Sequence, residues 1–271
     1  MENDVNVVES DQLQDVHKKN LVRRERIGKT FGSGFIRTIA ILLTIFVSLD
    51  LFAGFVSITA CDGSVFFQSV SWIALVVTRF VPNIIGCIAI WAIFSTAHGK
   101  HEINLLGFKA LRCVIVVMGI VVVLHLVGGI IMLALNTNYA TSIDSLSVVG
   151  TVILSIVIFT IFELVQLLVY IFVFVSINNL IKNKTGEEPM KLGKLTSVTL
   201  IAVGSLMVLN FVPIINIMDE IVRAFNLRNI PIYRAVSFIY QNPVSIILGG
   251  IIMIFGGIVV LLFNNRKQIE K

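Results

Sequence analysis

Long apolar stretches separated by short polar segments dominate the chain. The longest runs from Val148 to Ile177 and carries a single formal charge, Glu163, in 30 residues. At about 1.5 Å per residue, such a helix is roughly 45 Å long and exceeds the roughly 30 Å hydrocarbon core of a bilayer. With five further apolar stretches, the pattern predicts an all-α, polytopic integral membrane protein, a bundle of six transmembrane helices. We expect these helices at about 36–57, 66–94, 109–135, 148–177, 198–218 and 244–263.

The polar segments complete the domain plan around a membrane domain of residues 35–264. Residues 1–34 form a tail that is first acidic and then basic, and residues 265–271 form a short second tail. The segment 219–242 mixes arginine with apolar residues, which is typical of an interfacial amphipathic loop or of a partly re-entrant hairpin. Pro82 and Pro213 fall in the second and fifth apolar stretches, so we expect one or two helices to be kinked at proline.

Composition and charge distribution support this class and predict its topology. Charged residues make up 14% of the chain, against about 25% in soluble domains. Of the 21 Lys and Arg residues, 17 fall on one side of a six-span arrangement and 3 in the 219–242 loop, while Arg79 lies inside a span. This bias predicts a multi-pass protein with both termini cytoplasmic. The absence of an organelle signal favours the plasma membrane.

The basic half of the N-terminal tail, from Lys18 to Lys29, is expected to bind anionic lipid headgroups. The position of the cations therefore accounts for the net charge of +5 without a nucleic-acid partner.

Four ionisable side chains fall inside the apolar stretches: Asp50, Arg79, His125 and Glu163. Along their helices they lie at estimated depths of roughly 12 to 22 Å. An ionisable group in hydrocarbon is costly and marks a functional site by default. We predict that Asp50 and Arg79 form an ion pair, which leaves His125 and Glu163 to line a polar cavity or to exchange a proton. Alternatively, Glu163 is protonated or held by one partner and only fixes helix packing.

Further polar residues share faces with these groups. Ser155, Glu163, Gln166 and Tyr170 fall within an arc of roughly 80° on their helix, so this face is expected to meet protein or water rather than lipid. Asn83 is four residues after Arg79 and lies on the same face. The predicted intramembrane polar cluster comprises Asp50, Arg79, Asn83, His125, Glu163 and Gln166.

Small residues in the last apolar stretch predict close helix packing. Ser245, Gly249 and Gly256 fall within about 40° on one face, and Gly250 and Gly257 form a second row. Rows of this kind let two transmembrane helices approach closely.

The second and fifth stretches also share a short Phe-Val-Pro motif, beginning at Phe80 and at Phe211. Paired proline-interrupted spans at corresponding positions of two halves are typical of inverted-repeat transporters.

The sequence carries no recognisable catalytic, metal-binding or cofactor-binding motif, so we expect neither an enzyme nor a metal or cofactor site. His98 and His101 lack a third ligand, and the three cysteines form no CxxC pair.

Two functions fit these patterns. The first is a small membrane transport protein or permease-type subunit that handles a small solute or ion through the intramembrane polar cluster. The second is a non-transporting scaffold, assembly or regulatory subunit that holds partner transmembrane helices. The partner is then another membrane protein or a second copy of this chain. A transporter needs the Glu163 face to reach water in some state, whereas a scaffold needs that face sealed.

Overall fold

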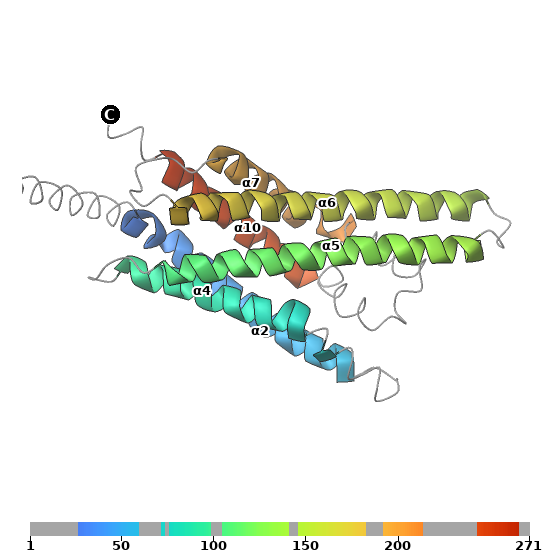
Figure 1. Ribbon diagram of the computed structural model, residues 1–271, viewed down its shortest axis with the longest axis horizontal. Coiled ribbons are helices and arrows are strands. Elements are labelled where there is room, and N and C mark those ends of the chain that lie inside the picture. Colours follow the sequence, from blue (N-terminus) through green and yellow to red (C-terminus); the bar gives the residue numbers. More distant parts are fainter. Residues whose placement is uncertain are drawn as a thin grey trace, which may run out of the picture.

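The computed structural model describes residues 27–59, 72–73, 76–98, 105–140, 146–182, 192–213 and 243–265. Throughout these residues the chain is helical apart from short turns (Figure 1). A helical turn at residues 27–31 precedes the first long helix. The elements in chain order are α2 (Gly34–Thr59), η1 (Val76–Phe80), α4 (Val81–His98), α5 (Leu106–Ala140), α6 (Leu146–Lys182), α7 (Gly193–Leu209) and α10 (Pro243–Asn265).

Five of these helices are long and apolar enough to cross a membrane, so the chain is a multi-pass membrane protein by this criterion. The qualifying segments are Gly34–Val56, Val76–His98, Leu106–Gly128, Thr160–Lys182 and Pro243–Asn265.

The expected fifth span, 198–218, differs from its helix in the structure. The helix α7 has 17 residues and begins five residues earlier, at Gly193. It ends at Leu209, and Asn210 caps it by donating its backbone N–H to Leu206 O at 2.9 Å. Residues 211–213 are again helical.

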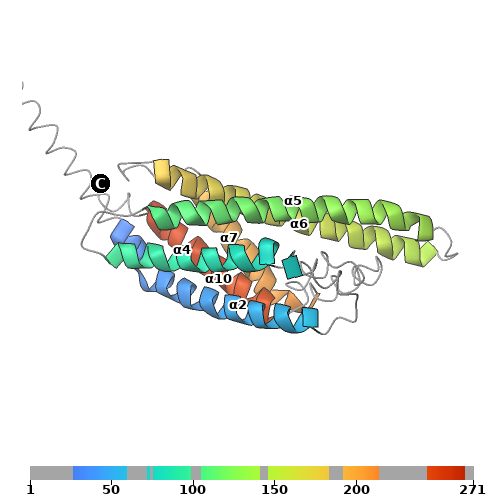
Figure 2. The same ribbon diagram turned by 60° about the horizontal axis from the view of Figure 1, so that its bottom comes forward.

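The helices form a closed ring in the order α2, α4, α5, α6, α7, α10, in which each contacts its two neighbours. Neighbouring helices run antiparallel (Figures 1 and 2). Accordingly, Gly107 at the start of α5 contacts Ile93 near the end of α4, and Gly193 at the start of α7 contacts Asn264 at the end of α10. Figures 1 and 2 show the N-terminal end of α2 and the C-terminal end of α10 at the same end of the bundle. We call this the basic end, because it carries Lys29, Arg37, Lys109, Arg112, Lys182 and Lys194.

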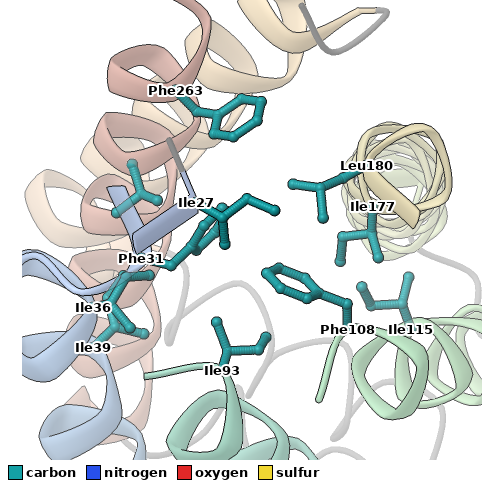
Figure 3. Packing of buried hydrophobic residues seen from close by; sticks show 11 residues of the cluster. Ile27, Phe31, Ile36, Ile39, Ile93, Phe108, Ile115, Ile177, Leu180 and Phe263 are labelled. Carbon is teal, nitrogen blue, oxygen red and sulfur yellow. The ribbon is translucent and has the colours of Figure 1, made fainter. Parts of the chain in front are cut away.

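The main hydrophobic core lies near the basic end. Phe31, in the turn before α2, packs edge-on against Phe108 of α5 and lies against Phe263 of α10. Side chains from the neighbouring helices point toward the same centre (Figure 3). In the opposite half, a smaller cluster joins Phe80 to Leu51 and Trp72.

Pro82 is the second residue of α4 and follows the π-helical segment η1 directly. A proline has no backbone N–H, so Pro82 cannot donate the α-helical hydrogen bond to the residue four positions earlier. A π-helix shifts its hydrogen bonds by one residue, so the irregular segment falls where the α-helical pattern is interrupted. Pro213 lies beyond the end of α7, in the helical turn 211–213.

Several predicted segments lie outside the described residues. They are most of the N-terminal tail, residues 66–71 and 74–75 of the expected second span, residues 214–218 of the expected fifth span, the 219–242 loop, and residues 266–271 of the C-terminal tail.

Candidate functional site

The predicted ion pair between Asp50 and Arg79 is present in the structure and joins α2 to η1. Arg79 Nε donates to Asp50 Oδ2 at 2.8 Å, and Arg79 Nη2 contacts the other carboxylate oxygen. Asn83, in the first turn of α4, donates to Asp50 Oδ2 at 3.1 Å. The two charged side chains are only 1% and 3% exposed. A two-pronged pair of this kind offsets much of the cost of placing both charges inside a membrane protein.

A second polar contact lies further along the same helix pair. Trp91 Nε1 donates to Thr44 Oγ1 at 3.0 Å, and Cys87 Sγ lies 3.3 Å from the same hydroxyl. The ion pair and these contacts therefore join α2 to the η1–α4 segment at two positions along its length. The position of Asp50, Arg79 and Asn83 between packed helices therefore indicates a clasp that holds the register of α2 and α4.

The ring of helices surrounds a cavity of about 280 Å³ near the basic end. Its wall draws residues from all six long helices of the ring and from the turn before α2. These residues are Phe, Ile, Leu, Val and Met, with four exceptions that are small or carry a hydroxyl group: Tyr170, Ser176, Thr196 and Gly256.

The hydroxyl groups of this wall bond to protein atoms. Ser176 Oγ lies 2.9 Å from Thr196 Oγ1. The single hydroxyl proton of Thr196 lies within reach of two backbone carbonyl oxygens, Leu192 O at 2.9 Å and Phe172 O at 3.3 Å. Tyr170 OH accepts a long hydrogen bond of 3.5 Å from Gln166 Nε2. Ordered water in a cavity needs two to four polar partners, so this cavity favours apolar contents over water.

The cavity is partly open rather than sealed, so a hydrocarbon group can reach its apolar wall. Such a group would make dispersion contacts with the wall and would remove apolar surface from water. The cavity therefore favours an apolar occupant.

Two heptad stripes of α6 line the cavity and lead to the predicted polar residues. Leu180 and Val173 form one stripe, and the next position, seven residues earlier, is Gln166. Ile177 and Tyr170 form the other, and its next position is Glu163, whose side chain is fully buried. Residues seven apart lie within about 20° of one another on an α-helix. The polar face of α6 therefore lies in line with the two cavity-facing stripes, beyond the last lining residues, Val169 and Tyr170.

The structure thus places the predicted polar residues in two settings. Asp50, Arg79 and Asn83 form the clasp between α2 and α4, while Gln166 and Glu163 extend the two cavity stripes of α6. The side chains of His125 and Ser155 lie outside the described residues.

The small-residue rows of α10 have different roles. A Cβ atom on Gly250 would lie 2.7 Å from Gly204 O, and one on Gly257 would lie 2.9 Å from Ser197 O. Ser197 Oγ also donates to Gly257 O at 2.7 Å. The tight contact with α7 is therefore made by the second row.

The first row packs more loosely. A Cβ atom on Gly249 would lie 3.6 Å from the Met207 side chain, and one on Gly256 would lie 4.0 Å from the Leu200 side chain. Gly256 lines the cavity, and Ser245 is buried.

Sequence reasoning missed the cavity, Ser176 and Thr196. In the sequence, these two residues stand out only as hydroxyl residues near the end of the fourth apolar stretch and the start of the fifth. Within the described residues, no three His, Cys, Asp or Glu side chains are grouped as a metal site. Comparisons of the chain with protein-family models, curated proteins and solved structures found no match.

Proposed function

We propose that this chain is a small membrane transport protein, or the permease-type subunit of a larger transporter. It passes a small solute through the centre of its helix ring. The observation that carries this proposal is the continuity of the cavity wall with Gln166 and Glu163 along two stripes of α6. A central cavity that leads to convergent polar groups within a helix bundle is the usual form of a small-molecule site. A buried carboxyl group at membrane depth is a typical feature of a transport pathway.

The proposal includes six spans: the five long helices and α7, which is the fifth span in chain order. At about 1.5 Å per residue the 17 residues of α7 extend about 25 Å, slightly less than the hydrocarbon core. The helical turn at 211–213 adds length, with a bend between them at Asn210. The antiparallel packing of α10 along α7 supports a crossing at α7 as well. We assign the basic end to the cytoplasm and the protein to a plasma membrane.

The test is the accessibility of the α6 stripe to water. In a background with Cys61, Cys87 and Cys113 replaced by alanine, Gln166→Cys is probed with a membrane-impermeant methanethiosulfonate from each side of sealed vesicles. We expect labelling from at least one side, because the reagent needs a hydrated thiolate.

Leu164→Cys is the matched control. Leu164 is two residues from Gln166, lies on the opposite side of α6 from the cavity stripes, and is 45% exposed on the surface expected to face lipid. It should stay unlabelled. If Gln166→Cys is also unlabelled from both sides, the α6 face is sealed and the transport proposal fails.

A scaffold or assembly role is the second candidate, and the length of the α5–α6 hairpin favours it. These helices have 35 and 37 residues, or roughly 52 and 55 Å, which exceeds even the roughly 45 Å of a bilayer with its headgroups. Figures 1 and 2 show the hairpin projecting past the ends of α2 and α4. Purification in mild detergent, followed by determination of the mass and composition of the complex, tests this role. A stoichiometric membrane-protein partner supports it, and a lone chain or homo-oligomer contradicts an assembly role with other proteins.

A further inference from the structure

The chemistry of the cavity wall narrows the class of ligand. The wall is almost entirely aliphatic and aromatic, and its Ser176 and Thr196 hydroxyl groups are engaged with each other and with backbone carbonyls. A polar or charged solute would lose its hydration in this cavity and gain few hydrogen bonds there. A hydrocarbon group would lose no hydrogen bonds and would restore the contacts that an empty volume forfeits.

The volume of the cavity limits the size of that hydrocarbon group. At about 280 Å³ it is nearly twice an apolar cavity of about 150 Å³ that holds benzene. It therefore accommodates roughly ten to twelve carbon atoms. This is one chain of medium length, and a second chain would not fit beside it.

The closed ring favours a single-chain molecule over a bilayer phospholipid. Each helix contacts its two neighbours in the ring. A phospholipid with one chain in the cavity would have to pass its second chain between two packed helices. A single-chain molecule can instead lie along the bundle axis, with its polar end at Tyr170 and the stripe positions beyond it.

We infer that the transported solute is an amphiphile with one hydrocarbon chain of about ten carbons and a small hydrogen-bonding head. This inference rests on the transport function proposed above. The chain occupies the central cavity, and the head lies toward Tyr170, Gln166 and Glu163 on α6.

The inference is tested by photolabelling the full chain in phosphatidylcholine vesicles. The probe is a straight-chain alkanol of about ten carbons with a diazirine at the far end of its chain. We expect adducts on cavity residues such as Val173 and Met253, and we expect unlabelled decanol to compete for them. A second arm uses phosphatidylcholine with the same diazirine in one chain. That probe should label exposed positions such as Leu124 and leave the cavity residues unlabelled.

A variant that fills the cavity provides the specificity control. Gly256 lines the cavity, and the nearest atom to a Cβ placed there would be 4.0 Å away, so a larger side chain can begin without a clash. We expect Gly256→Phe to lower cavity labelling by the alkanol by about tenfold. Leu262→Phe introduces the same side chain at an exposed position of α10 and should leave labelling unchanged.

Each outcome decides the inference. Cavity labelling by phosphatidylcholine equal to that by the alkanol would overturn it in favour of a bilayer lipid, and labelling by neither probe would also overturn it. The result is separate from the cysteine test above. Saturable alkanol labelling with Gln166→Cys inaccessible would leave a binding site without transport, whereas an accessible Gln166→Cys without alkanol labelling would leave transport of a different solute.

Discussion

At the scale of single residues, Asp50 and Arg79 are the clearest case of mutual dependence. Each is almost fully buried and each neutralises the other. Removal of one partner leaves the other as an uncompensated charge, at a cost of about 3 to 5 kcal/mol. We therefore predict that Asp50→Asn and Arg79→Gln each lower the free energy of unfolding by that amount, measured by titration with sodium dodecyl sulfate in mixed micelles. The double variant should lose clearly less than the sum of the two.

Thr44→Val is the control for this cycle, because it also removes a polar contact between α2 and α4. Its hydroxyl accepts a hydrogen bond from Trp91 but carries no charge. Its loss should cost only about 1 kcal/mol. Additive effects of Asp50→Asn and Arg79→Gln would contradict a clasp in which the two residues act as one unit.

At the scale of helices, two adjacent glycines of α10, Gly249 and Gly250, allow the effect of an added methyl group to be compared at a loose and at a tight helix contact. A methyl group on Gly250 would meet Gly204 O at 2.7 Å, whereas one on Gly249 would lie 3.6 Å from the Met207 side chain. We predict that Gly250→Ala destabilises the protein by about 1 to 3 kcal/mol, because α7 and α10 would have to separate. Gly249→Ala should stay within about 0.5 kcal/mol of the parent. The same micelle titration measures both, and equal effects would show that the α7–α10 contact does not depend on Gly250.

The α7–α10 contact also shows which parts of the fold were predictable. The apolar stretches predicted the long helices, and the cost of isolated charges in hydrocarbon predicted the pairing of Asp50 with Arg79. The sequence of α10 alone could not rank its two small-residue rows, because both present equally small surfaces. The choice depends on Ser197 and Gly204 in α7, which face Gly257 and Gly250.

The cavity was unpredictable for a related reason. It depends on the order of the helices in the ring and on side chains that end short of its centre, and neither has a period in the sequence. Residues such as Val173 and Leu180 look like any lipid-facing aliphatic until the ring places them on the inside. The polar residues of α6 were visible in the sequence, but their continuity with an apolar wall was not.

At the scale of the whole molecule, the basic end fixes an orientation that can be tested at both ends of α7. Among the described residues every Lys and Arg except Arg79 lies at this end, and cytoplasmic segments are enriched in these residues. We predict that Lys194→Cys, at the start of α7, is labelled by an impermeant maleimide only from the cytoplasmic side. Gln241→Cys, just before α10, should be labelled only from the opposite side.

This pair of variants also separates five spans from six. The contact between Gly193 and Asn264 places the start of α7 beside the end of α10. If α10 crosses the membrane, its first residues lie on the far side, and the chain between Lys194 and Gln241 has to cross once. Labelling of both cysteines from the same side would mean that α7 does not span, and the ring could not then enclose a pathway from one side to the other. Lys109→Cys, exposed at the start of α5, is the internal reference for the cytoplasmic side.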